Sequence, residues 1–212
     1  FGDHSDVMAC RQTGFAMLCE GNVQEVMDLS PVAHLAALTG KVPFINFFDG
    51  FRTSHEIQKI AVWDYKDLAE MCDMDAVKAF REHALNPEHP HMRGSHENGD
   101  TFFQHREACN QYYDALPEVV ESYMDKINAK LGTDYKLFNY YGAPDADRVI
   151  VAMGSICDVA EEVIDYLNAH GEKVGLIKVR LYRPFKAERL IEAIPATCKK
   201  IAVLDRTKEP GA

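Results

Sequence analysis

Four polar residues near the start of the chain, Asp3-His4-Ser5-Asp6, carry side chains that could bind a polar ligand or exchange protons. They come just before a segment with helical character. As structure, Ser5 or Asp6 would cap that helix by accepting hydrogen bonds from its first amides. In the functional interpretation, the four residues would form a polar loop that faces an active-site cleft. The local sequence leaves both interpretations open.

Five histidines crowd one stretch of the chain, as a metal site would require: His83, His89, His91, His96 and His105. Their spacing matches neither HExxH nor an HxH pattern with a placed carboxylate. The six cysteines include no CxxC pair, so neither a zinc site nor an iron–sulfur site is predicted. We expect solvated or interfacial histidines and reduced thiols.

Basic residues and a glycine turn mark the second half of the chain. Gly154-Ser155 stands between a predicted strand and a predicted helix, where free amides suit an anion or a partner surface. The turn lacks the GxGxxG pattern, so no dinucleotide site is predicted. Arg180, Arg183 and Arg206 end predicted strands, where they would face an anion, an acidic neighbouring domain, or neither.

The first half of the sequence predicts four elements: a helix over 6–21, a helix over 23–38, a buried strand over 41–48 and a helix from near Ser54. Gly40 is expected to cap the second helix in a left-handed conformation. Thr53 and Glu56 have the spacing of a capping box. Asp49 and Arg52 then follow a strand end, where α/β folds gather ligand-facing residues.

Residues 84–118 show little periodicity and predict a long irregular arm, which in a compact protein is usually functional or interfacial. A helical stripe over 117–131 follows and ends at Gly132. Beyond Gly142-Ala143-Pro144, taken as a linker, strands over 148–153, 174–181 and 200–204 alternate with two helices. This order predicts a Rossmann-like parallel βαβαβ sheet.

The composition fits a globular protein, since 47% of the 212 residues are hydrophobic and 26% are charged. A net charge of −10 argues against general nucleic-acid binding. No apolar run is long enough to span a membrane, and no secretory signal is recognisable. The chain lacks an initiator methionine, and we expect it to be part of a larger cytoplasmic protein.

Five long motifs in series carry a resemblance to a known family: FGDHSDVMACRQTGF at 1–15, FFDGFRTSHE at 47–56, NPEHP at 86–90, KVRLYRPF at 178–185 and LDRTKEPGA at 204–212. They resemble pyruvate:ferredoxin (flavodoxin) oxidoreductase, a thiamine-diphosphate enzyme. The resemblance implies an α/β fold of two parallel-sheet layers. Residues 1–137 would be the later part of the pyrimidine-binding domain, and 138–212 a Rossmann-like transketolase C-terminal-like domain.

The family's activity is the oxidative decarboxylation of pyruvate to acetyl-CoA and CO₂, with electrons passed to ferredoxin or flavodoxin. The resemblance implies thiamine diphosphate, Mg²⁺ and iron–sulfur clusters in the parent enzyme, none of them bound by this chain alone. The carboxylate that activates the cofactor would lie upstream, and the metal-binding and cluster domains downstream. The implied partners are pyruvate, CoA, the electron carrier, the remaining domains and a second subunit of a homodimer, with neither nucleic acid nor membrane.

The resemblance therefore implies no catalytic and no metal-binding residue in this chain. The residues expected to line the cofactor cleft form one loop: Asp3, His4, Ser5 and Asp6. A more distant second choice is Phe48, Asp49 and Arg52. The alternatives are a non-redox thiamine enzyme of transketolase type and, for the isolated chain, a structural or dimerisation module without activity.

Overall fold

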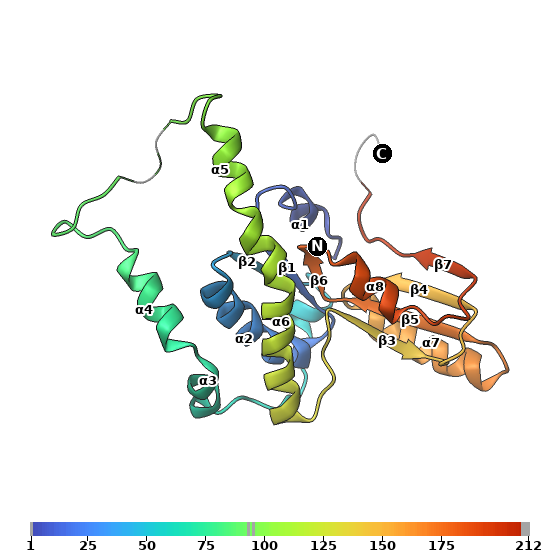
Figure 1. Ribbon diagram of the computed structural model, residues 1–212. Coiled ribbons are helices and arrows are strands. Elements are labelled where there is room, and N and C mark those ends of the chain that lie inside the picture. The colour runs from blue at the N-terminus through green and yellow to red at the C-terminus, as the bar shows by residue number, and fades with distance from the viewer. Residues whose placement is uncertain (1, 93, 95, 209–212) are drawn as a thin grey trace.

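The computed structural model describes residues 2–92, 94 and 96–208, which form two sheets lying side by side (Figure 1). The first sheet has the order β2 (Phe44–Phe48), β1 (Ala16–Glu20) and β6 (Leu181–Arg183). The second has the order β3 (Phe138–Gly142), β5 (Val174–Val179), β4 (Arg148–Ala152) and β7 (Lys200–Val203). The predicted α/β class with two parallel-containing sheets is confirmed.

The helices fall into three groups. The first half contains α1 (Ser5–Ala9), α2 (Val23–Gly40), the short 3₁₀ turn η1 (Thr53–His55) and α6 (Asn110–Leu131). The arm contains α3 (Tyr65–Met71), α4 (Met74–Glu82) and α5 (Phe102–Ala108). The second half contains α7 (Ile156–Ala169) and α8 (Ala187–Ala193). In the described part of the chain, no helix combines the length and the apolar character needed to cross a membrane.

The helix predicted over 6–21 is wrong beyond residue 9. Only α1 is helical, and Ala16–Glu20 forms β1, the central strand of the first sheet, with every residue buried. Neighbouring strands cover both edges of β1, parallel β2 and antiparallel β6. A strand that is buried on both faces has no polar alternation, so its sequence resembles that of a helix. The burial of residues 16–20 within the tertiary structure, and not their local pattern, therefore makes this segment a strand.

The second predicted helix is confirmed as α2, and Asn22 caps it by accepting a hydrogen bond from the Glu25 amide at 2.9 Å. The predicted cap is wrong, because Lys41 and not Gly40 has the left-handed conformation, with φ of 57°. Gly40 instead lets α6 approach closely. A Cβ at Gly40 would lie 2.4 Å from a methyl carbon of Leu116.

The predicted helix near Ser54 is also wrong. Only the single turn η1 forms there, and the Thr53 hydroxyl donates to the carbonyl of Gly21 at 3.3 Å and caps no helix. The predicted strand is shorter than expected and begins at Phe44.

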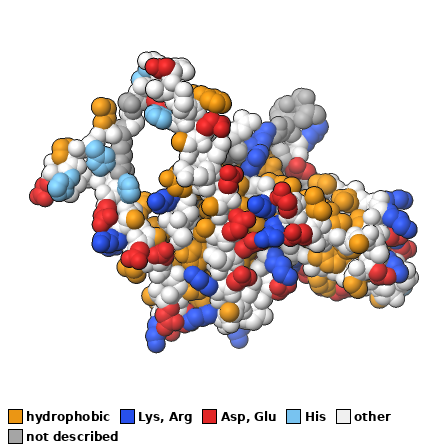
Figure 2. All heavy atoms as spheres, in the orientation of Figure 1, with side chains coloured by type: hydrophobic (Ala, Val, Ile, Leu, Met, Phe, Trp, Pro, Cys, Tyr) orange, Lys and Arg blue, Asp and Glu red, His pale blue; other side chains and the backbone are white. Residues whose placement is uncertain are grey.

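The arm protrudes from the first half in Figure 1, and the described residues between α4 and α5 (83–92, 94 and 96–101) form no helix or strand. The prediction of irregular structure over 84–118 is wrong from residue 102 onward, where α5 and α6 form. Pro117, expected to start a helix, lies inside α6 and is buried. Neither α4 nor α5 buries a residue. Figure 2 shows histidines spread along this arm, and all five predicted ones are exposed to solvent.

We expect limited proteolysis to cut first within 83–101, because its described residues lie outside any helix or strand and all but Glu97 are exposed. The predicted linker at 142–144 is a poor target. Gly142 is the last residue of β3, and Ala146 is fully buried. Mass spectrometry of early fragments tests this, and first cleavage near 142–147 would contradict it.

The second sheet contains the predicted parallel strands β4, β5 and β7, and its edge strand β3 runs antiparallel to β5. Helices cover both faces, as side-chain alternation along β5 shows. Leu176 packs with α7 residues such as Ile164, whereas Ile177 belongs to the main core that also contacts Leu190 of α8. This main core extends through both halves of the molecule.

The chain crosses between the two sheets at β5 and β6. After Val179 it passes Arg180, and Leu181 then pairs with Leu18 of the first sheet. The two sheets are thus joined through one continuous segment as well as through side chains.

Candidate functional site

Asp49, directly after β2, binds three separate segments of the chain. Its side chain is fully buried. The Ser155 amide donates to Asp49 Oδ2 at 2.8 Å, His4 Nε2 contacts Oδ1, and Arg206 Nη1 donates to Oδ2. Arg206 Nη1 also donates to the Ser155 hydroxyl at 3.0 Å. We call the set of His4, Asp49, Ser155 and Arg206 the Asp49 joint.

Glycine is required at position 154 by both conformation and space. Gly154 has φ of 82°, and a Cβ there would lie 2.7 Å from Asp49 Oδ1. The turn therefore brings the Ser155 amide, at the N-terminal end of α7, onto the carboxylate. The anion expected at this turn is thus the side chain of Asp49 from the first half of the same chain.

The Asp49 joint keeps its carboxylate ionised. Burial by itself raises the pKa of Asp49, but hydrogen bonds from His4 and Ser155 outweigh it and lower the pKa to about 2. Such a weak base is not suited to accept a proton near neutral pH. The Asp49 carboxylate therefore positions segments of the chain and is not a general base.

A second buried contact also joins the two halves. Arg180, which follows β5, donates from Nη1 and Nη2 to the two carboxylate oxygens of Glu25 in α2, at 2.7 and 2.8 Å. Its Nε donates to Asn139 at 2.7 Å, and the Gly21 amide donates to Glu25 at 2.7 Å. Burial raises the pKa of Glu25, but Arg180 outweighs this effect and holds the pKa below its usual value.

A cleft of about 430 Å³ opens beside the Asp49 joint, where the carboxyl ends of strands from both sheets meet. Its lining comes from both halves and includes two bases and two acids: Arg52, Arg206, Glu56 and Asp158. Asn22, which caps α2, donates to Asp158 at 3.1 Å and so links the two halves near this cleft. Four of the eight residues that line the cleft carry a charge, so it suits a polar ligand or a neighbouring part of a larger protein.

The residues predicted to line a cofactor cleft split into two kinds. His4 is buried in the Asp49 joint, whereas Asp3, Ser5 and Asp6 are exposed. Asp6 Oδ1 accepts a hydrogen bond from the Val7 amide at 2.8 Å. His4 is the N-cap residue of α1, but its side chain makes no capping hydrogen bond. Of the second-choice residues, Asp49 is central to the joint, Arg52 lines the 430 Å³ cleft and Phe48 is partly exposed.

The structure places the three predicted basic residues in different environments. Arg180 and Arg206 each pair with a buried acid of the first half, Arg180 with Glu25 and Arg206 with Asp49. Arg183 is exposed, with its guanidinium 5.6 Å from the Tyr182 ring.

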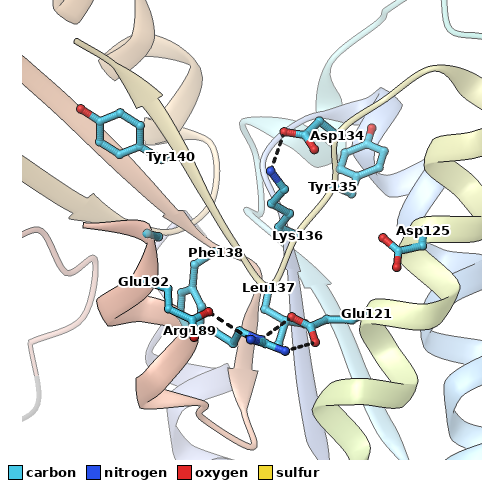
Figure 3. A pocket seen from close by; sticks show the side chains of 11 residues that line it. Glu121, Asp125, Asp134, Tyr135, Lys136, Leu137, Phe138, Tyr140, Arg189 and Glu192 are labelled. Atoms are coloured by element: carbon cyan, nitrogen blue, oxygen red, sulfur yellow. Dashed lines mark hydrogen bonds and ion pairs between the residues drawn. The ribbon is translucent and has the colours of Figure 1, made fainter. Parts of the chain in front are cut away.

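A larger groove, of about 670 Å³, lies between α6, β3 and α8 (Figure 3). Arg189 of α8 reaches across it to Glu121 of α6, at 2.9 and 3.2 Å, and to Glu192 at 3.0 Å. Lys136 pairs with Asp134 at its rim. The two bases of the groove, Arg189 and Lys136, are thus already paired with acids that line the same groove. We therefore interpret it as a contact region between the two halves and not as a ligand site.

Among the described residues, no group of three or more histidine, cysteine or acidic side chains could hold a metal ion. All six cysteines are free, and Cys19 and Cys157 are buried. Burial raises the pKa of both thiols, that of Cys157 to about 12, so neither is a reactive thiolate at neutral pH.

Sequence reasoning missed Glu20 and Glu25. Glu20 ends the buried strand β1 and is itself fully buried. The sequence did offer a signal for Glu20, because an acid at the end of an otherwise apolar run can be a buried acid. Glu25 gave no such signal, because an acid in the first turn of a helix is ordinary, and its partner Arg180 is 155 residues away.

Comparison with protein-family models gives two matches along the chain. Residues 1–125 match the family described as pyruvate flavodoxin/ferredoxin oxidoreductase, thiamine diphosphate-binding. Residues 146–212 match pyruvate:ferredoxin oxidoreductase core domain II.

Two curated relatives are 62% identical over 212 residues: the pyruvate-flavodoxin oxidoreductase of Enterobacter agglomerans and the pyruvate:ferredoxin oxidoreductase of Moorella thermoacetica. The match covers all of this chain but only 18% of either relative. The fold resembles that of a 2-oxoglutarate:ferredoxin oxidoreductase from Magnetococcus marinus, solved with 2-oxoglutarate, coenzyme A and succinyl-CoA bound. The TM-score is 0.54 at 21% identity, over 95% of this chain and 37% of that one.

The thiamine diphosphate-binding family model covers more than half of the chain, and the second model covers most of the remainder. The two matches follow one another in the order of the two sheets. The chain therefore belongs to the pyruvate flavodoxin/ferredoxin oxidoreductase family.

Proposed function

We propose that the chain is one part of an enzyme that oxidatively decarboxylates pyruvate. The reaction takes pyruvate and CoA to acetyl-CoA, CO₂, a proton and two electrons, which pass one at a time to ferredoxin or flavodoxin. The observation that carries the proposal is the uninterrupted 62% identity over all 212 residues to relatives named for this activity. The transketolase-type alternative has no comparable support.

The described residues fit one of the three expected cofactors. Exposed polar side chains in the loop 3–6 fit a wall that hydrogen-bonds thiamine diphosphate, which supplies the carbanion chemistry of decarboxylation when bound. Mg²⁺ and iron–sulfur clusters need groups of oxygen or sulfur ligands that the described residues do not offer. We propose that parts of the enzyme outside this chain hold both.

The role we assign to this chain is positional. Asp49 holds His4, and with it the loop 3–6, against the turn before α7 and against Arg206. We further propose a domain division at residues 137 and 138, a homodimeric enzyme and a cytoplasmic location. The two family-model matches, which end at 125 and resume at 146, support the division.

The chain alone is expected to show no turnover with pyruvate, CoA, thiamine diphosphate, Mg²⁺ and a low-potential dye. Its described residues offer no cluster of histidine, cysteine or acidic side chains for a metal ion, and we therefore expect the metal-linked diphosphate that the reaction needs to require other parts of the enzyme. The matched control is the intact enzyme, which should reduce ferredoxin or flavodoxin only when pyruvate and CoA are both present. Thiamine-dependent dye reduction by the chain alone would contradict the first expectation. Ketol transfer without reduction would contradict the proposed function.

In the intact enzyme, His4→Ala is expected to lower kcat/KM about tenfold, which corresponds to about 1.4 kcal/mol of transition-state binding. His4 contacts the buried Asp49 carboxylate and so fixes the loop without exchanging protons with substrate. Kinetics of His4→Ala and Asp6→Ala, with thiamine affinity measured alongside, test this. If kcat/KM is unchanged in both variants, the loop 3–6 only begins a helix. If kcat/KM of His4→Ala falls by several orders of magnitude, His4 takes part in the chemical step.

A further inference from the structure

We propose that Glu20 is a neutral carboxylic acid in the folded protein, and that its ionisation at raised pH weakens the Glu25–Arg180 contact that joins the two sheets. The proposal concerns a buried acid that the proposed function does not use. It is independent of the substrate of the enzyme.

Among the described residues, Glu20 has no ion-pair partner. Its side chain is fully buried at the end of β1, and neither carboxylate oxygen forms a hydrogen bond within this part of the chain. The amide oxygen of Asn46 in β2 is likewise buried without a donor. An ionised carboxylate would add charge to a buried set of oxygen acceptors, whereas a protonated one brings a donor.

Arg180 is the base whose charge acts on Glu20, and three of its five N–H donors are bound elsewhere. Nη1 and Nη2 bind both oxygens of Glu25, and Nε binds Asn139. One guanidinium therefore neutralises one of two neighbouring glutamates. The geometry assigns the negative charge to Glu25 and the proton to Glu20.

The groups around Glu20 act on its titration in opposing directions. Burial is the main influence and raises the pKa of Glu20 well above its usual value, and repulsion from Glu25 of α2 raises it further. Arg180 and the Asn46 amide oppose this but do not overcome it. The thiol of the adjacent Cys19 is itself neutral, because burial raises its pKa well above the usual value.

The direction of the pH effect follows from these groups. The folded state holds the Glu20 proton more tightly than the unfolded chain does. Above the ordinary glutamate pKa, the folded state therefore still carries a proton that the unfolded chain has lost. Stability is then lost, by up to about tenfold in the folding equilibrium constant per pH unit, until the folded-state pKa is reached. Above that point the new charge repels Glu25.

The test compares the wild-type chain with Glu20→Gln by urea denaturation from pH 5 to pH 9. Glutamine keeps the size of the side chain but cannot ionise. We expect the variant to gain stability relative to wild type with each rise in pH. Glu162→Gln on the exposed face of α7 is the matched control, and its pH profile should follow that of wild type. Parallel profiles for wild type and Glu20→Gln would overturn the proposal.

Infrared spectroscopy gives a second readout that does not depend on the variant folding. Glutamate labelled with ¹³C in the carboxyl group should show a protonated-carboxyl stretch at pH 7 in wild type, which disappears at high pH. Glu20→Gln should lack the band. An absent band in folded wild-type protein at pH 7 would mean that Glu20 is ionised and would refute the proposal directly.

Discussion

Replacing Arg180 with methionine is expected to lower the free energy of unfolding by about 3–5 kcal/mol, because the Glu25 carboxylate is left buried without its counter-ion. The pair is almost wholly excluded from solvent, with 4% of the Arg180 side chain and 9% of the Glu25 side chain exposed. Arg180→Lys should also be destabilising, since an ammonium group cannot reproduce the two parallel bonds to Glu25 together with the bond to Asn139.

The double variant Glu25→Met with Arg180→Met distinguishes a buried charge from lost packing. It should recover much of the stability that either single change loses, because no unpaired charge remains. Recovery will be incomplete, since the Gly21 amide loses its acceptor. Lys173→Met breaks the exposed pair with Asp145 and should change stability far less. Urea denaturation of wild type, the two single methionine variants, the double variant and Lys173→Met checks this, and equal losses for Arg180→Met and Lys173→Met would contradict it.

The sequence predicted those parts of the fold whose signals are local. The α2 helix, the strand β4 and the end of α6 at Gly132 could be read from periodicity and turn residues. The strand β1 could not, because burial on both faces removes the alternation that distinguishes a strand. The short strand β6 could not either, since its place in the first sheet depends on pairing with residues far earlier in the chain.

The candidate site was predictable only in its parts. His4, Asp49 and Arg206 each drew attention as polar residues near predicted element ends, and the structure brings them together with Ser155. The sequence ranked Asp49 behind the loop 3–6 because nothing local shows that a turn more than 100 residues later will reach it. Long-range assembly, and not residue type, made Asp49 the centre.

The Asp49 joint is expected to contribute about 2 kcal/mol of stability that depends on ionisation of its carboxyl group. The pKa of Asp49 is about 2 in the folded protein, against 3.8 for a free aspartate. A lowered pKa in the folded state means that this contribution is present above about pH 4 and is lost as pH falls towards 2. Burial opposes the shift, so the bonds from His4 and Ser155 must account for it.

Asp49→Asn tests this expectation, because asparagine keeps the shape of the side chain and cannot carry the charge that Arg206 binds. The variant should be less stable than wild type at pH 7, and the difference should shrink as pH falls from 4 to 2, where wild type also loses its charge. Urea denaturation at several pH values measures both. Asp64→Asn, at the exposed cap of α3, is the matched control for removing a carboxylate that accepts an amide hydrogen bond. A difference between Asp49→Asn and wild type that stays constant from pH 7 to pH 2 would show that packing, and not the buried charge, holds the two halves together at this point.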